Sequence, residues 1–185
     1  MKIASNVTFG NYNTIVAGAE IRTGVRLGNG NTILGGILGE RVTLQNSNRV
    51  YPNAEVGSGT TIGSATSIFG TVGQNVEILD SVTIQEQATV GDSSFLGLAC
   101  TVRHLAQLED NVSLGRIADI GRSARIGAGS ELGYEVCVED GTVLPKGTQV
   151  EDRGMVSSDG KIFSAPAEVH RRFHYRNGNC IEGNR

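Results

Sequence analysis

An aliphatic residue recurs at every sixth position over most of this chain. The longest run starts at Val72 and ends at Ile162, with sixteen consecutive rungs and no exception. The residue two places before each rung is small or is valine, from Gly70 to Gly160. Neither an α-helix, with a period of about 3.6, nor a strand, with a period of about 2, has this spacing. The pattern therefore predicts a repeat architecture whose unit is six residues long.

Two earlier runs extend the repeat towards the N-terminus. One has rungs from Ile3 to Ile33, and the next has rungs from Leu38 to Ile68. The joins from Ile33 to Leu38 and from Ile68 to Val72 drop one and two residues rather than adding a loop. The whole pattern comprises twenty-eight hexads.

The repeat has a direct physical interpretation. Residues i−2 and i point the same way on a short strand, and Gly, Asn or Asp in the remaining positions suits a sharp corner. Three such strands and corners make one triangular coil of eighteen residues. Twenty-eight hexads give about nine coils, and at about 4.8 Å per coil the prism is about 45 Å tall.

Composition and charge narrow the class of protein. A chain of 185 residues suggests one domain, and the absence of Trp points to a core of small and aliphatic side chains. The net charge of −3 argues against nucleic-acid binding. We expect no signal peptide, because the opening MKIASNVTFG has no apolar segment, and no membrane span.

The three cysteines, Cys100, Cys137 and Cys180, form no CxxC pair. Their odd number and wide separation indicate free thiols, and therefore a cytoplasmic protein.

The ladder and its corners resemble the hexapeptide-repeat, left-handed parallel β-helix superfamily, and the resemblance covers residues 1–163. It implies an all-β, left-handed parallel β-helix. Most members are trimeric, LpxA-like acyltransferases with active sites between neighbouring prisms. Others are γ-class carbonic anhydrases or non-catalytic subunits such as the dynactin pointed-end proteins, so the fold does not decide the function.

Two functions from different classes remain open. The opening VTFGNYNTIVAGAEIRTGVRLGNGNTI, residues 7–33, is similar to the early coils of sugar acyltransferases. That similarity implies an acyltransferase taking acetyl-CoA or another acyl-CoA as donor and a sugar or other small molecule as acceptor. The alternative is a non-catalytic scaffold or assembly subunit, favoured because no join adds the projecting loop that carries substrate contacts in many of these enzymes.

His104 is the candidate catalytic base, because it is the only histidine in the regular repeat. It follows the rung Val102 by two residues, which places it at an outward corner. Residues eighteen apart stack there in the order Glu86, His104, Arg122 and Asp140. Glu86 would orient the imidazole and raise its basicity. The alternative is an exposed ladder of alternating charge that keeps the coils in register.

Asparagines form a second column, at Asn13, Asn31 and Asn48. We interpret it as an internal ladder of stacked amides rather than a polar binding notch.

A metal site is not expected. The segment CTVRHLAQLEDNVSLG, residues 100–115, loosely resembles a zinc-binding stretch of γ-class carbonic anhydrases. The two positions that carry histidine ligands there are best matched here by Leu98 and Arg103, which cannot bind zinc. An active carbonic anhydrase is therefore not predicted.

The tail, residues 164–185, forms a separate unit in this interpretation. Ser164 as N-cap and Pro166 in the first turn predict a short helix over 164–178 that covers the open end of the prism. His170 and His174 share the spacing of metal ligands, but solvent exposure is the preferred interpretation. The basic cluster Arg171, Arg172 and Arg176 could hold phosphate, including that of CoA, or an acidic protein partner.

Apolar residues at outward positions, Leu79, Leu98 and Leu105, together with the resemblance, predict self-association as a homotrimer.

Overall fold

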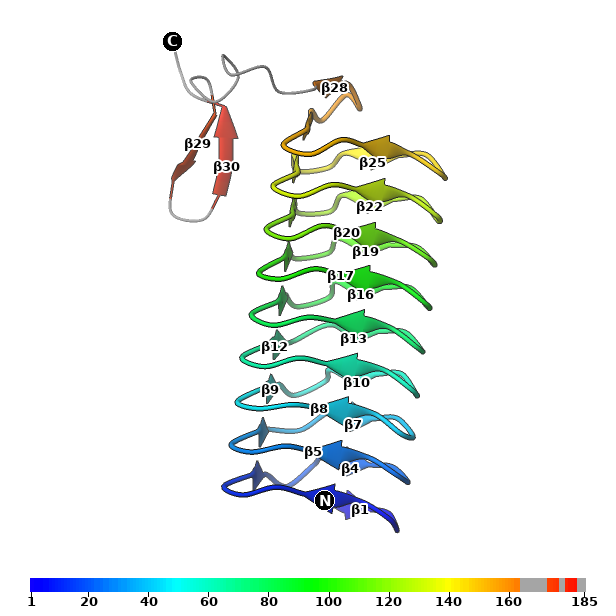
Figure 1. Cartoon of the computed structure of the whole chain (residues 1–185), viewed down its shortest axis with the longest axis vertical. Helices are drawn as coiled ribbons and strands as arrows, with labels where there is room; N and C mark the ends of the chain where they lie inside the picture. The colour runs from blue at the N-terminus through cyan, green and yellow to red at the C-terminus, as the bar shows by residue number, and fades with distance from the viewer. Residues whose placement is uncertain (164–172, 177–178, 183–185) are drawn as a thin grey trace.

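The computed structural model of the protein describes residues 1–163 and, in the tail, residues 173–176 and 179–182. Residues 1–163 wind into a stack of triangular coils, each made of three two-residue strands (Figure 1). Strands three apart in chain order pair side by side, so three sheets run along the stack. This confirms an all-β solenoid of about nine coils. Its left-handedness and the domain boundary at residue 163 stay predictions.

The first sheet has nine parallel strands: β1 (Lys2–Ile3), β4 (Glu20–Ile21), β7 (Ile37–Leu38), β10 (Glu55–Val56), β13 (Thr71–Val72), β16 (Thr89–Val90), β19 (Gln107–Leu108), β22 (Arg125–Ile126) and β25 (Val143–Leu144). The second sheet also has nine: β2 (Thr8–Phe9), β5 (Arg26–Leu27), β8 (Thr43–Leu44), β11 (Thr61–Ile62), β14 (Glu77–Ile78), β17 (Phe95–Leu96), β20 (Ser113–Leu114), β23 (Glu131–Leu132) and β26 (Gln149–Val150).

The third sheet has ten strands: β3 (Thr14–Ile15), β6 (Thr32–Ile33), β9 (Arg49–Val50), β12 (Ser67–Ile68), β15 (Thr83–Ile84), β18 (Thr101–Val102), β21 (Asp119–Ile120), β24 (Cys137–Val138), β27 (Met155–Val156) and β28 (Ile162–Phe163). The turns that lead from a third-sheet strand to the next first-sheet strand are called the third corner below.

The register confirms both joins in the sequence pattern. Val102 pairs with Ile120, eighteen residues later, as a regular coil requires. Across the joins, Ile21 pairs with Leu38 and Val56 pairs with Val72, so the dropped residues shorten a turn and leave the sheets in step. Both short turns lie at the third corner.

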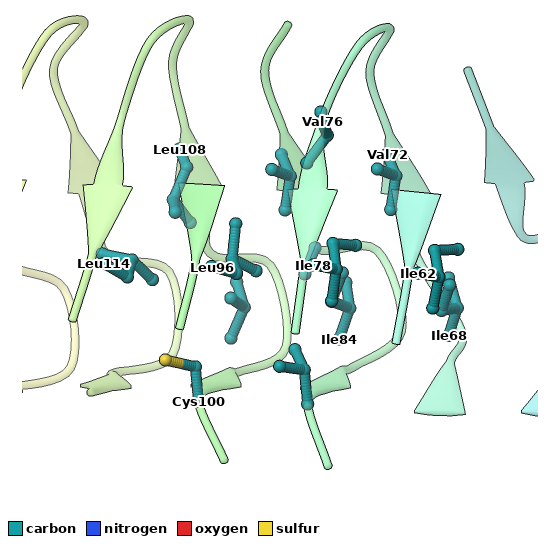
Figure 2. Packing of buried hydrophobic residues seen from close by; sticks show 14 of the residues in the cluster. Ile62, Ile68, Val72, Val76, Ile78, Ile84, Leu96, Cys100, Leu108 and Leu114 are labelled. Carbon is teal, nitrogen blue, oxygen red and sulfur yellow. The ribbon is translucent and has the colours of Figure 1, made fainter. Parts of the chain in front are cut away.

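The aliphatic rungs fill the interior of the prism. Every rung from Ile21 to Val156 is buried, and Ile120 is 0% exposed. Figure 2 shows Ile62, Ile78, Leu96 and Leu114 following one another along the second sheet. Full burial of such a side chain contributes about 1.5–3 kcal/mol, so the column supplies the main driving force for folding. No large aromatic side chain is needed to fill the space between three sheets this close together.

The two ends of the ladder differ from its middle. Ile3 and Phe9, in the first coil, are 41% and 47% exposed, and their strands β1 and β2 pair with another strand on one side only. Ile162 was expected to be the last inward rung, and this is wrong: β28 turns back antiparallel to β27, and Ile162 is 43% exposed.

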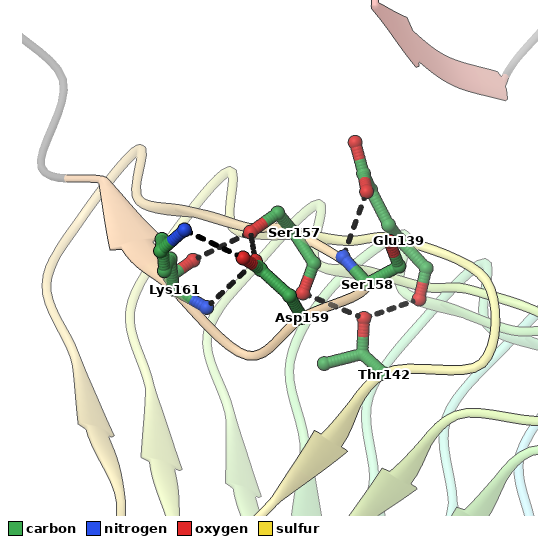
Figure 3. A network of polar contacts seen from close by, with 6 residues as sticks. All are labelled: Glu139, Thr142, Ser157, Ser158, Asp159 and Lys161. Carbon is green, nitrogen blue, oxygen red and sulfur yellow. Dashed lines mark hydrogen bonds and ion pairs between the residues drawn. The ribbon is translucent and has the colours of Figure 1, made fainter.

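A polar network at this end turns the chain around (Figure 3). The Asp159 carboxylate accepts a hydrogen bond from the Ser157 hydroxyl at 2.5 Å and pairs with the Lys161 ammonium at 2.7 Å. The Ser158 N–H donates to the Glu139 carboxylate at 2.8 Å, and the Thr142 hydroxyl donates to the Ser157 carbonyl at 3.2 Å. These contacts tie the reversed segment to the coil before it.

Corner residues bind the coil next to them. The main-chain N–H of Asp92 donates to the Asp110 carboxylate at 2.9 Å. In the same way, the main-chain N–H of Gln74 donates to the Asp92 carboxylate at 2.7 Å. Several corners hold positive φ without Gly or Asn, including Leu105 (φ 60°) and the β-branched Ile117 (φ 62°). Such conformations are costly for side chains of this kind, and the paired coils on both sides hold them in place.

The asparagine column is internal. Asn31 and Asn48 are 0% exposed, and Asn13 is partly buried. The Asn31 side-chain oxygen accepts the Asn48 N–H at 3.0 Å, and the Asn48 amide nitrogen donates to the Gly63 carbonyl at 2.7 Å. The amides therefore bind the main chain of neighbouring coils rather than one another, and this column is a structural element rather than a binding notch.

The helix expected over 164–178 falls largely on residues 164–172 and 177–178, outside the described residues. At residues 173–176 the expectation is wrong, because Phe173–Arg176 forms strand β29, paired antiparallel with β30 (Asn179–Glu182). The part of the chain that the structure describes contains no α-helix.

Candidate functional site

The third corner carries the predicted column of polar residues. Glu86, His104, Arg122 and Asp140 occupy equivalent turn positions on consecutive coils, because β15, β18, β21 and β24 pair in register. The structure thus brings the two predicted site residues, Glu86 and His104, onto adjacent coils.

The His104 side chain is half-buried and is held from the neighbouring coil. Its ring nitrogen Nδ1 lies 2.8 Å from the main-chain carbonyl oxygen of Glu86, and its main-chain N–H donates to the Gln85 side-chain oxygen at 3.0 Å. A carbonyl only accepts hydrogen bonds, so Nδ1 carries a proton, and the neutral form of the ring then has its lone pair on Nε2. The Glu86 main chain, rather than its carboxylate, contacts the ring.

A shortened turn lies at the same corner, two coils before this histidine. Only Phe69 and Gly70 separate β12 from β13, whereas four residues form the equivalent turn in the next coil. The Phe69 ring stacks on that of Tyr51, with 3.7 Å between ring centroids. Gly70 is required here, because a Cβ atom at this position would lie 2.3 Å from the Ala88 carbonyl oxygen.

The shortened turn leaves an open hollow next to His104. The hollow has a volume of about 420 Å³ and is lined by Phe69, Thr83, Gln85, Glu86 and His104. A second hollow, of about 480 Å³, adjoins it and shares Phe69 and Glu86 with it. One apolar wall and several polar groups therefore surround the imidazole, in a space large enough for a small molecule.

The sequence pattern missed two parts of this site. The absence of two residues after Ile68 indicates, in the sequence, only a join without a loop. In the structure this short turn lies at the same corner as His104, two coils before it. Gln85 was missed because a lone glutamine carries no motif. Counting turn lengths corner by corner would have indicated the hollow.

The rest of the column plays a different part. The Arg122 N–H donates to the Asp140 carboxylate at 2.6 Å, and the Ser123 N–H donates to the His104 carbonyl at 3.0 Å. None of the ion pairs within residues 1–163 joins two members of the column. Hydrogen bonds donated by main-chain N–H groups, rather than ion pairs between members of the column, link these coils.

A buried ion pair flanks the site. The Arg103 guanidinium donates to both carboxylate oxygens of Asp119, at 2.7 Å from Nε and 2.5 Å from Nη2. Both side chains are largely buried, with 11% and 7% exposed. This bidentate pair fixes the main chain immediately before His104 to the next coil.

The positions compared with zinc ligands have other surroundings. Leu98 is 42% exposed at a corner between the second and third sheets, and Arg103 binds Asp119. Residues 1–163 contain no group of three or more His, Cys, Asp or Glu side chains that could hold a metal ion. His170, Arg171 and Arg172 lie outside the described residues.

The cysteines differ from one another. Cys100 is a free, buried thiol, and its burial raises its pKa to about 11. Cys137 is disulfide-bonded, so the expectation of free thiols is wrong for this residue. A cytoplasmic location stays a prediction. No helix in the described part of the chain is long and apolar enough to cross a membrane.

Comparisons with known proteins agree with the coil architecture. No protein-family model matches the chain, and no curated protein matches its sequence significantly. Among solved structures, UDP-N-acetylglucosamine acyltransferase from Francisella novicida matches with a TM-score of 0.53 and 13% identity, over 89% of this chain and 72% of that one. The enzyme of the same name from Campylobacter jejuni matches with a TM-score of 0.51 and 17% identity, over 94% and 74%. The Moraxella catarrhalis UDP-N-acetylglucosamine O-acyltransferase has a TM-score of 0.49 and 18% identity, over 89% and 77%.

At these identities the likeness is one of fold alone. It agrees with the six-residue ladder and with the three parallel sheets. The chain therefore has the fold of the hexapeptide-repeat β-helix superfamily.

Proposed function

We propose that this protein is an acyltransferase that moves an acyl group from coenzyme A to a hydroxyl or amino group of a small acceptor such as a sugar. The observation that carries the proposal is the state of His104. The Glu86 carbonyl fixes the proton on Nδ1, and the ring lines an open hollow. An imidazole with a bare Nε2 is the group that such a reaction needs as its base.

The chemistry follows from this arrangement. Nε2 takes the proton of the acceptor hydroxyl or amine while the acceptor's oxygen or nitrogen attacks the thioester carbonyl. The resulting imidazolium keeps its hydrogen bond from Nδ1 to the Glu86 carbonyl. When the tetrahedral intermediate collapses, the C–S bond breaks and the thiolate of coenzyme A takes the proton from Nε2.

The resemblance of the repeat to acyltransferases supports this choice of reaction, and two solved structures that match with TM-scores above 0.5 are named as UDP-N-acetylglucosamine acyltransferases. We further propose a homotrimer in which a neighbouring copy covers the open side of the hollow. Leu98 and Leu105, 42% and 41% exposed, lie at the two corners that border the third sheet. Leu79 is half-buried at the same corner as Leu98.

One observation favours the scaffold alternative. Every turn between β1 and β27 has four residues or fewer, and the turn from β27 to β28 has five, so within residues 1–163 no long loop projects to hold a substrate. A scaffold has no use for His104, and this difference separates the two functions.

The test is an assay of coenzyme A release. Purified protein is mixed with acetyl-CoA and a panel of amino sugars, neutral sugars and nucleotide sugars, and the free thiol is measured with a chromogenic reagent. We expect acceptor-dependent release in the wild type and its loss in His104→Ala. Release that is equal in the two proteins would contradict the proposal. Sedimentation as a stable monomer at micromolar concentration would contradict the trimer.

A further inference from the structure

The orientation of the Gln85 carboxamide is determined by His104. The main-chain N–H of His104 needs an acceptor, and only the oxygen of a carboxamide can accept. This oxygen lies 3.0 Å from the His104 nitrogen, so the NH₂ group of Gln85 occupies the opposite side of the amide plane. Among the residues that the structure describes, no acceptor binds this NH₂ group.

Gln85 is also firmly placed. Its main-chain N–H donates to the Val102 carbonyl at 2.9 Å, and its carbonyl accepts the Ala88 N–H at 3.2 Å. The side chain is half-buried and lines the same hollow as His104. A donor with two N–H groups therefore stands beside the base, anchored through its own oxygen. Its orientation needs no further rearrangement when a substrate enters.

We propose that the Gln85 NH₂ group donates a hydrogen bond to the carbonyl oxygen of the acyl group and stabilises the oxyanion that forms there. This inference rests on the proposed function and adds a catalytic residue to it. When the acceptor attacks, the carbonyl π electrons move onto the oxygen, and the Gln85 N–H meets this new negative charge. When the carbonyl re-forms, the C–S bond electrons leave with the thiolate of coenzyme A, which takes the proton held by His104.

The loss of kcat expected on removing the Gln85 NH₂ group depends on whether the group stabilises the oxyanion or only positions His104. A positioned donor in an oxyanion site accounts for about 10²–10³ in kcat. A group that merely positions His104 would instead alter the pH profile or the fold. The two roles therefore predict different readouts for the same variant.

The decisive variant is Gln85→Glu. A carboxylate keeps an oxygen for the His104 N–H but replaces the two N–H donors with a second oxygen. It also adds a negative charge beside the imidazole. The rate is therefore compared on the plateau of each protein's pH profile, which is measured for both. Gln107→Glu is the matched control, because Gln107 is exposed at the start of β19 and lines neither of the two hollows.

The experiment follows hydrolysis of p-nitrophenyl acetate by the full chain, with water as the acceptor. We expect the wild type to exceed His104→Ala, Gln85→Glu to lose about 10²-fold or more on the plateau, and Gln107→Glu to match the wild type. Gln85→Leu, which also lacks the donors, is the second variant if Gln85→Glu does not fold.

Each remaining outcome is decisive. If the wild type exceeds His104→Ala but a folded Gln85 variant stays within about threefold of the wild type, the Gln85 proposal is overturned and the proposed function stands. If the wild type and His104→Ala are equal, the proposed function fails, and the Gln85 proposal fails with it.

Discussion

The imidazole Nδ1 of His104 lies 2.8 Å from the main-chain carbonyl oxygen of Glu86, one coil away. The regular stacking of coils alone brings these two atoms together, because the eighteen-residue register places one turn directly over the other. A main-chain carbonyl cannot be removed by substitution at Glu86. The tautomer of the candidate base is therefore a property of the solenoid itself, independent of which side chain occupies position 86.

The first prediction separates the Glu86 side chain from its main chain. His104→Ala is expected to lower acyl transfer by about 10²–10⁴-fold, as loss of a general base does. Glu86→Gln keeps the carbonyl, so we expect a much smaller loss of turnover. Both variants are expected to unfold within about 1 kcal/mol of the wild type, measured by urea denaturation, because both side chains lie at a surface corner. An equal loss of turnover in the two variants would assign the orienting role to the carboxylate.

The second prediction concerns the shortened turn. Gly70→Ala places a Cβ atom 2.3 Å from the Ala88 carbonyl oxygen, and the main chain must shift to accommodate it. We expect a loss of about 1–3 kcal/mol, as for other overpacked sites, together with loss of transfer activity as the hollow changes shape.

Gly129→Ala is the control for this variant. Gly129 has φ +69° and no atom within 4 Å of an added Cβ, so only the cost of positive φ applies there. If the Gly70→Ala protein is as stable and as active as the wild type, the turn accommodates a Cβ atom and the prediction is wrong.

The third prediction concerns the internal asparagine column. The Asn48 oxygen accepts the Thr66 N–H at 2.9 Å, and its amide nitrogen donates to the Gly63 carbonyl. Asn48→Ala leaves both main-chain groups buried without these partners, at a cost of about 1–3 kcal/mol each. Thermal denaturation compared with Asn11→Ala, at an exposed corner, measures the effect. Equal stability of the two variants would contradict the structural role of the column.

The fourth prediction concerns pH. Hydrogen bonds from Lys161 and Ser157, together with the charge of Lys161, lower the pKa of Asp159 to about 2. The folded-state pKa is depressed, so the carboxylate stabilises the fold above the ordinary Asp value of about 3.9, and this contribution is lost as the pH falls towards 2. The melting temperatures of the wild type and Asp159→Asn are therefore expected to differ at pH 7 and to converge as the pH approaches 2. A difference that stays constant over this range would contradict the assignment.

The extent to which the sequence predicts this structure depends on how local each feature is. The rungs from Ile21 to Val156 repeat one local environment, so their spacing predicts both the sheets and the core. Ile162 obeys the same spacing but lies where the chain reverses. This reversal depends on the contacts of Ser158 with Glu139 and of Ser157 with Asp159, which no periodicity encodes.

The candidate site illustrates the same limit. The eighteen-residue period predicts that Glu86 and His104 lie on adjacent coils. It does not predict which atoms meet, and the contact is made by a main-chain oxygen that every residue possesses. The hollow arises from the absence of two residues after Ile68, and Gln85 gains its role only from the anchored position of its oxygen.

Isothermal titration of the purified protein with acetyl-CoA is the sharpest test of the proposed function, because an acyltransferase must bind its donor and a scaffold need not. We expect saturable binding with one site per chain. Competition by free coenzyme A at the same site is also expected, since the donor and the product share the nucleotide. Absence of binding heat at millimolar acetyl-CoA would contradict the assignment as a CoA-dependent acyltransferase and would favour the scaffold.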